Sequence, residues 1–248
     1  MNYLLLFFFT ILSACTNNTI QKQDMRKSKI VQLPGHYNVQ DNTWENSDPN
    51  YDAYSSFGED LYATFSKLDK DGNSLGLGLI DKSGKVIIQP IYSSVTMRIR
   101  TENDFFVVSD SLNNYGIVNS EGVEIVNPQF DDIYFGNNAA DSMDTKFGLI
   151  KVSKNDKKGY INATGRVIVP VKYDDLFMMG KNGLIMFQVL IPIGNGNNTA
   201  KWGIMDFDQK IISPPRFSYP SRFENGRVTL VSEGIEYDVN ENGIIKKK

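Results

Sequence analysis

The chain has 248 residues, of which 41% are hydrophobic and 12% are aromatic, and its formal net charge is −3 with a pI near 5.3. This is long enough for one sizeable hydrophobic core. The weakly acidic charge balance lacks the basic footprint of a nucleic-acid-binding protein, so we expect no nucleic-acid partner. One histidine and one cysteine exclude a structural disulfide framework and a zinc site built from several histidines.

The first 14 residues have the features of a secretory signal peptide. Their apolar run spans residues 4–12 and is interrupted only at Thr10. It is too short for a transmembrane helix, which needs about 20 apolar residues. We therefore predict a cleavable signal at residues 1–14.

The sequence Leu12-Ser13-Ala14-Cys15 resembles the lipobox of bacterial lipoproteins. The resemblance implies cleavage before Cys15 and attachment of lipid, including palmitate, to that residue. It also implies a membrane anchor in the bacterial cell envelope. Because Thr16 is not Asp, the anchor would lie in the outer membrane of a Gram-negative organism. The alternative is an ordinary signal peptide that precedes a chance cysteine.

Two segments separate this signal from the rest of the chain. Residues 15–32 are polar with no apolar period, which predicts a flexible tether. Residues 33–59 carry several aromatic residues among Asn, Asp, Pro and Gly, without strand alternation. End repeats of repeat proteins are atypical because they cover an open end, so we expect an irregular N-terminal cap here.

Residues 77–92 predict a strand, a tight turn and a second strand. The stretch Asp81-Lys82-Ser83-Gly84 has the composition of a type I turn closed by a left-handed glycine. The β-branched run 86–88 suits a partly buried strand, and Pro90 is expected to end it because proline has no N–H to donate.

The same pattern returns along residues 60–248 about five times. The turn position recurs at intervals of 38, 43, 44 and 34 residues, which is a repeat-protein period. An Asp or Asn stands three positions before each turn position, suited to capping the turn. An aromatic residue stands eight positions after each of the first four turn positions, and a proline stands five or six positions after each of them. The turn positions are Gly84, Gly122, Gly165, Gln209 and Gly243, and the aromatic residues are Tyr92, Phe130, Tyr173 and Phe217.

A further β-prone run precedes each hairpin, so each unit reads as a three-stranded antiparallel meander. No segment has apolar residues at helical spacing over 11 or more residues. Such small sheets cannot bury both faces alone. We therefore predict an all-β fold in which the meanders stack as a curved solenoid or a small propeller-like array.

These residues resemble the WG-repeat family of bacterial proteins. Trp202-Gly203 is the literal Trp-Gly pair, whereas Leu77-Gly78 and Tyr115-Gly116 replace the Trp. The resemblance implies a repetitive β scaffold and no shared catalytic residues. Gln209 departs from the expected glycine, and since a non-glycine residue in the left-handed region costs on the order of 1 kcal/mol, we expect a different turn in the fourth copy.

Few side chains suggest chemistry. His36 lies outside the repeats, and we expect it to be structural or solvent-exposed. Carboxylate pairs can act as general acid and base, but Asp131-Asp132 and Asp174-Asp175 share one repeat position, which favours a capping role. Residues 68–73 imitate a calcium loop without its Gly and Glu, so we expect a turn. Residues 194–198 lack the Lys of a phosphate-binding loop and predict a flexible loop.

The sequence thus favours a membrane-anchored binding module that recognises a protein or a glycan of the cell envelope, with no catalytic residue, cofactor or metal. One alternative is an envelope-polymer hydrolase that uses the repeat Asp residues. A second alternative is a purely structural envelope component.

Overall fold

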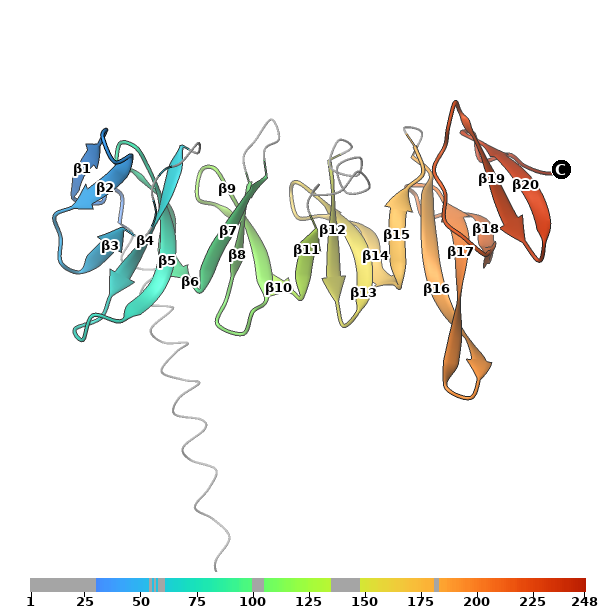
Figure 1. Cartoon of the computed structure of the whole chain (residues 1–248), viewed down its shortest axis with the longest axis horizontal. Coiled ribbons are helices and arrows are strands. Elements are labelled where there is room, and N and C mark those ends of the chain that lie inside the picture. Colours follow the sequence, from blue (N-terminus) through green and yellow to red (C-terminus); the bar gives the residue numbers. More distant parts are fainter. Residues whose placement is uncertain are drawn as a thin grey trace, which may run out of the picture. The chain divides into compact units, whose positions relative to one another are not determined.

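A computed structural model describes residues 30–53, 55, 57, 61–99, 105–134, 148–180 and 183–248. The predicted signal peptide, Cys15 and nearly all of the predicted tether lie outside these residues. Every regular element in the described ranges is a β-strand, as predicted (Figure 1). None of the described residues forms a helix long and apolar enough to cross a bilayer.

The strands form one hairpin and five small sheets, in chain order (Figure 1). The hairpin is β1 (Gly35–Asn38) and β2 (Thr43–Asn46). The first sheet is β3 (Tyr51–Ala53), β4 (Tyr62–Leu68), β5 (Ser74–Asp81) and β6 (Val86–Tyr92). The second is β7 (Ser94–Ile99), β8 (Phe105–Ser109), β9 (Tyr115–Asn119) and β10 (Glu124–Phe130). The third is β11 (Asp132–Tyr134), β12 (Leu149–Lys154), β13 (Lys157–Asn162) and β14 (Val167–Tyr173). The fourth is β15 (Asp175–Met178), β16 (Ile185–Gly194), β17 (Asn197–Met205) and β18 (Ile211–Phe217), and the fifth is β19 (Arg227–Ser232), β20 (Ile235–Asn240) and β21 (Ile245–Lys247).

Each sheet is a meander of sequential neighbours, which confirms the predicted architecture. The first four sheets have four strands rather than the predicted three. In sheets two to four the additional strand is β7, β11 or β15, which begins two residues after the aromatic residue of the preceding copy. These strands are only three to six residues long, too short to give a clear alternation of their own.

The chain divides into two compact units, one of residues up to 113 with 117–124, and the other of residues 114–116 with 125–248. Within each unit the cores lie between consecutive elements. In the first unit one cluster joins the cap to the first sheet and another joins the first sheet to β8 and β9. In the second unit the clusters join the third sheet to the fourth and the fourth to the fifth. Within each unit, therefore, neighbouring sheets bury a shared interior, as the repeat pattern requires.

The N-terminal segment 33–59 is more regular than expected. It contains the hairpin β1–β2 and strand β3, which pairs with β4. Strands of three or four residues do not show alternation, and the hairpin turn depends on Asn42, which has φ of 55°. The indole of Trp44 packs on Gly84, and the Leu33 N–H donates to the Gly84 carbonyl at 2.8 Å. The segment thus covers the first repeat corner.

In the first, third and fourth copies, the glycine at the Trp-Gly position, the proline and the aromatic residue belong to one β-bulge. In the first copy Leu77 pairs with Tyr92 and Leu79 pairs with Ile88, so three residues of β6 lie opposite Gly78 alone. The same register shift recurs in the third and fourth copies, in the pairs Lys158–Tyr173 and Tyr160–Val169, and Trp202–Phe217 and Ile204–Ser213.

The bulge corrects the expectation that Pro90 ends its strand. Pro90 lies within β6, and the prolines of the other three copies lie within β10, β14 and β18. Proline is compatible with a strand at a bulge, because the bulged residues need no N–H for the ladder. The aromatic residue that follows is buried in all four copies.

Glycine is required in the bulge because of space. A Cβ atom at Gly159 would lie 2.6 Å from the carbonyl oxygen of Val169, and at Gly116 it would lie 2.5 Å from that of Val126. The bulged strand crowds Gly78 in the same way, whereas a Cβ at Gly203 would lie 2.5 Å from the Phe187 ring and 2.9 Å from the Ser213 carbonyl oxygen. None of these four glycines has a positive φ. Close approach of neighbouring atoms, of which the nearest is a backbone oxygen of the opposite strand in three copies and an atom of the Phe187 ring in the fourth, therefore explains this glycine better than backbone conformation does.

The five repeat corners share one capped turn, as predicted. At each corner the N–H of the turn position donates to the carbonyl of the Asp or Asn three positions earlier, at 2.9–3.0 Å. The side-chain Oδ1 of that residue accepts further backbone N–H groups, for Asn162 those of Thr164 at 3.0 Å and Arg166 at 2.9 Å. The capping residues are Asp81, Asn119, Asn162, Asp206 and Asn240.

The expectation of a different turn at Gln209 is wrong. Gln209 has φ of 63°, close to the 77° of Gly165, and its N–H donates to the Asp206 carbonyl at 3.0 Å. Its side-chain Nε2 also donates to the carbonyl of Ile168 in the preceding copy, at 3.2 Å. This extra contact offsets part of the cost of the left-handed conformation.

Candidate functional site

The first acid of each Asp pair joins one sheet to the next. Asp131 and Asp174 each follow the aromatic residue of a copy, between β10 and β11 and between β14 and β15. Their N–H groups donate to carbonyls in the second strand of the following sheet, and their carboxylates accept an N–H two residues further along. The Asp131 N–H donates to the Ser153 carbonyl at 2.9 Å, and the Asp131 carboxylate accepts the Asn155 N–H at 2.6 Å. The Asp174 N–H donates to the Gln188 carbonyl at 3.1 Å, and the Asp174 carboxylate accepts the Leu190 N–H at 2.8 Å.

The Asp174 carboxylate accepts hydrogen bonds at both of its oxygens. Its Oδ1 accepts a hydrogen bond from Lys157 Nζ at 2.6 Å while Oδ2 accepts the Leu190 N–H. Burial acts to raise the pKa of Asp174, but the hydrogen bonds from Lys157 and Leu190 outweigh it and hold the pKa below its ordinary value. A carboxylate with both oxygens engaged is poorly suited to exchanging protons with a substrate.

The second acid of each pair caps the strand that it begins. Asp132 accepts the N–H of Ile133 at 2.8 Å, and Asp175 accepts that of Leu176 at 2.9 Å. Lys158 Nζ lies 3.2 Å from Asp175. These contacts agree with the capping interpretation of both pairs.

The loop resembling a calcium site is a turn. Asp69 Oδ1 accepts the N–H groups of Asp71 and Asn73, both at 2.8 Å, and Gly72 has φ of 83°. Hydrogen bonds from the backbone and side chain of Asn73 lower the pKa of Asp69. In the ranges that the structure describes, no three His, Cys, Asp or Glu side chains are grouped to bind a metal ion.

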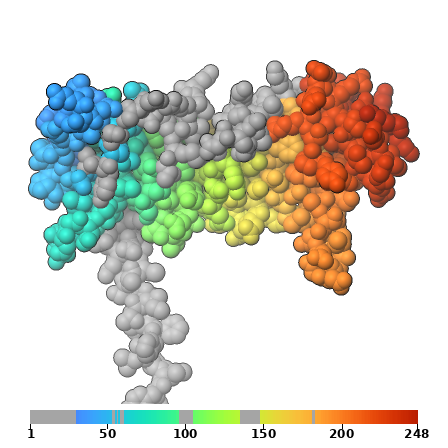
Figure 2. Space-filling model, in the orientation of Figure 1, coloured from blue at the N-terminus to red at the C-terminus, as the bar shows by residue number. Residues whose placement is uncertain are grey.

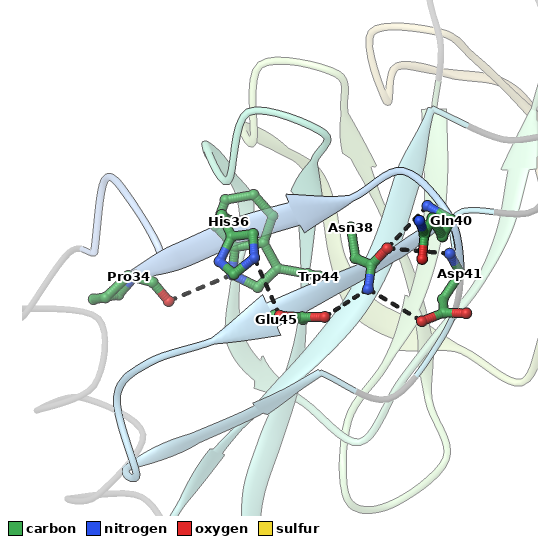
Figure 3. A network of polar contacts seen from close by, with 7 residues as sticks. All are labelled: Pro34, His36, Asn38, Gln40, Asp41, Trp44 and Glu45. Carbon is green, nitrogen blue, oxygen red and sulfur yellow. Dashed lines mark hydrogen bonds and ion pairs between the residues drawn. The ribbon is translucent and has the colours of Figure 1, made fainter.

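His36 lies in a polar network on the surface of the cap (Figure 3). Its Nε2 is 3.1 Å from Glu45 Oε2, and the His36 side chain is 72% exposed. Asn38 links Glu45 to Asp41 through its amide, with distances of 2.6 and 3.1 Å (Figure 3). The network stabilises the β1–β2 hairpin from outside and leaves His36 solvent-exposed, as expected.

The segment 194–198 is not the flexible loop that the sequence suggested. It is the tight turn of the β16–β17 hairpin, whose strands pair from Ile185–Met205 to Gly194–Asn197. Asn195 and Gly196 have φ of 52° and 75°, as a two-residue hairpin turn requires. The Asn195-Gly196 dipeptide was the sequence signal that could have predicted this hairpin turn. The outer part of this hairpin projects from the surface of the second unit (Figure 2).

The match to a known protein family agrees with the repeated geometry. Residues 78–108, 115–141, 159–189 and 202–234 match the WG containing repeat. No curated protein matches the chain. Two solved structures of Hsv2 from Kluyveromyces lactis are similar. One is 13% identical, covers 83% of this chain and 67% of its own, and has a TM-score of 0.33. The other is 11% identical, covers 73% and 71%, and has a TM-score of 0.26.

The matched segments do not coincide with the sheets. The first match runs through β5 and β6 of the first sheet and then through β7 and β8 of the second. Each copy therefore contributes to two consecutive sheets. The bulge glycine, the capped corner and the residues that join one sheet to the next all fall inside this repeated sequence, and the four matched segments of the chain are similar to the WG containing repeat.

Proposed function

We propose that the chain is a binding module of the bacterial cell envelope, held at the membrane by lipid on Cys15, and that it recognises a protein or a glycan. The observation that carries the proposal is the structural use of the candidate acids. Both oxygens of Asp174 are engaged, and its equivalents cap backbone groups, so the repeats offer a scaffold rather than an acid–base pair.

The lipid anchor is tested by replacing Cys15. Metabolic labelling with a palmitate analogue is expected to label the wild-type chain and not Cys15→Ala. The variant should also leave the membrane fraction. Unlabelled wild-type protein with a free Cys15 thiol would contradict the anchor.

The binding role is tested by crosslinking in intact cells followed by mass spectrometry, which is expected to recover an envelope protein or glycan. Hydrolase activity is tested on purified peptidoglycan and polysaccharide. We expect no turnover by the wild-type chain. Turnover that disappears when Asp131, Asp132, Asp174 and Asp175 are replaced by Asn would overturn the binding module in favour of the hydrolase.

A further inference from the structure

The outer part of the β16–β17 hairpin is an arm of two strands that pairs with no third strand among the described residues. β15 pairs with β16 only as far as Gln188, and β18 pairs with β17 only as far as Trp202. We call residues 189–201 the arm. Leu190, Ile191 and Ile193 are 46%, 39% and 65% exposed, although the inner residues of β16 are buried. A free two-stranded hairpin is only marginally stable in water, so this surface is suited to a partner.

The β16 edge of the arm is closed to a further strand. The Leu190 N–H points away from β17, since it donates to Asp174 at 2.8 Å. Backbone groups alternate along a strand, so those of residue 192 point to the same outer edge. Residue 192 is proline and has no N–H. Asp174 and Pro192 therefore remove both outward donors, a common protection of edge strands.

No strand in the described ranges pairs with the outer β17 edge of the arm. Because Leu190 and Gln188 face outward, Val189 and Ile191 face β17, where they pair with Lys201 and Thr199. The backbone groups of Asn198 and Ala200 then point to the outer edge of β17. Neither residue is a proline, and β18 does not reach them. Residues 197–201 thus present two outward N–H and two outward carbonyl groups.

The occupant must supply backbone hydrogen bonds as well as apolar contact. A lipid bilayer cannot pair an open strand edge, and the turn of the arm is made of Gly and Asn. An extended polypeptide fulfils both requirements. Residues 189–200 contain no Asp, Glu, Lys or Arg, so two arms can approach each other without repulsion between like charges.

We propose that the arm pairs with the arm of a second copy of this chain. The two β17 edges would run antiparallel about a two-fold axis through Thr199. Asn198 would then lie opposite Ala200 of the other copy, and the four outward groups of each edge would form four hydrogen bonds in all. Ile191 of each copy, which pairs with Thr199, would lie on one face of a four-stranded sheet.

The two Lys201 side chains stay apart in this register. Each lies opposite Asn197 of the other copy, so about four residues, or roughly 13 Å, separate them along the strands. The contact is small compared with the roughly 1,200–2,000 Å² of stable complexes, so we expect weak association that rises with concentration. The inference does not depend on the lipid anchor or on the proposed ligand.

Disulfide trapping tests the register. The chain from residue 15 with Cys15→Ser contains every described residue and no other cysteine. Thr199→Cys places two thiols opposite each other, at a separation that a disulfide spans. Under mild oxidation we expect it to form covalent dimers at least tenfold faster than Asn197→Cys, the matched control on the same strand face. A mixture of Asn197→Cys and Lys201→Cys chains is expected to crosslink as heterodimers.

A second substitution tests the edge. Ala200→Pro removes one outward N–H and is expected to reduce the Thr199→Cys rate to that of the control, with circular dichroism showing that the sheets remain folded. Equal rates for Thr199→Cys and Asn197→Cys would overturn the proposal. So would fast trapping that persists with Ala200→Pro, or a strictly monomeric chain that co-sediments with phosphatidylcholine vesicles through Ile191 and Ile193.

Discussion

The bulge and the corner of each copy both use glycine, but for different reasons. At the bulge, Gly159 has an ordinary φ and lies against the backbone of the opposite strand. At the corner, Gly165 has φ of 77°, and a Cβ there would in addition lie 2.7 Å from the Ile125 carbonyl oxygen. The fourth copy shows the difference, since it keeps Gly203 at the bulge and replaces the corner glycine by Gln209 in the same conformation. The corner of the fourth copy thus has room for a side chain in the left-handed conformation, at a cost, whereas the bulge of the same copy keeps its glycine.

Gly159→Ala is expected to have the largest effect. Its Cβ would lie 2.6 Å from the Val169 carbonyl oxygen and 2.8 Å from backbone atoms of Pro170 and Val171. Overpacking against backbone that cannot shift costs about 3 kcal/mol. Urea unfolding monitored by fluorescence measures the loss. Gly148→Ala is the control, because its φ is 69° but no atom lies within 4 Å of its Cβ, and it should lose only about 1 kcal/mol. Equal losses would refute the distinction.

Removing a corner cap should have an intermediate effect. Asn162→Ala leaves the N–H groups of Thr164 and Arg166 without their side-chain acceptor. The expected loss is about 1–2 kcal/mol, as for other capping residues. Thr164→Ala removes only a hydroxyl that donates to Asn162, and its midpoint in the same unfolding experiment should barely move.

Exchanging the residues of the two corners sharpens the comparison. Gln209→Gly relieves a left-handed cost of about 1 kcal/mol and loses one hydrogen bond to Ile168, so we expect a net gain of roughly 0.5 kcal/mol. Gly165→Gln should destabilise instead, because its Cβ would lie 2.7 Å from the Ile125 carbonyl oxygen. Differential scanning calorimetry should therefore show melting shifts of opposite sign, and shifts of the same sign would contradict the proposed difference.

The smallest effect on stability is expected at Asp174, which joins the third sheet to the fourth. The pKa of Asp174 is lower in the folded chain than its ordinary value of 3.8, so its contribution to stability is present above that value and is lost as the pH falls below it. Asp174→Asn should flatten the fall in stability between about pH 4 and pH 2. Acid titration of the melting temperature measures this change, and an identical slope in both proteins would show that the junction does not depend on the charge.

The parts of the fold predicted from sequence were those fixed by local chemistry. The capping residues, the corner glycines and the buried aromatic residues could be predicted because the residue type alone indicates the role of each. The bulge was missed because its signal is split between Gly78 and Pro90, which come together only when the strands pair. The protection of the outer β16 edge by Asp174 was missed for the same reason, since Asp174 and Leu190 are 16 residues apart in the sequence.

The offset between sequence copies and sheets has a genetic consequence. A copy that begins at one bulge glycine and ends before the next supplies the second half of one sheet and the first half of the following sheet. Duplicating or deleting such a stretch in frame leaves every remaining sheet complete. Tandem recombination within the gene can therefore lengthen or shorten the protein by whole sheets, without passing through a product that has an unfinished one.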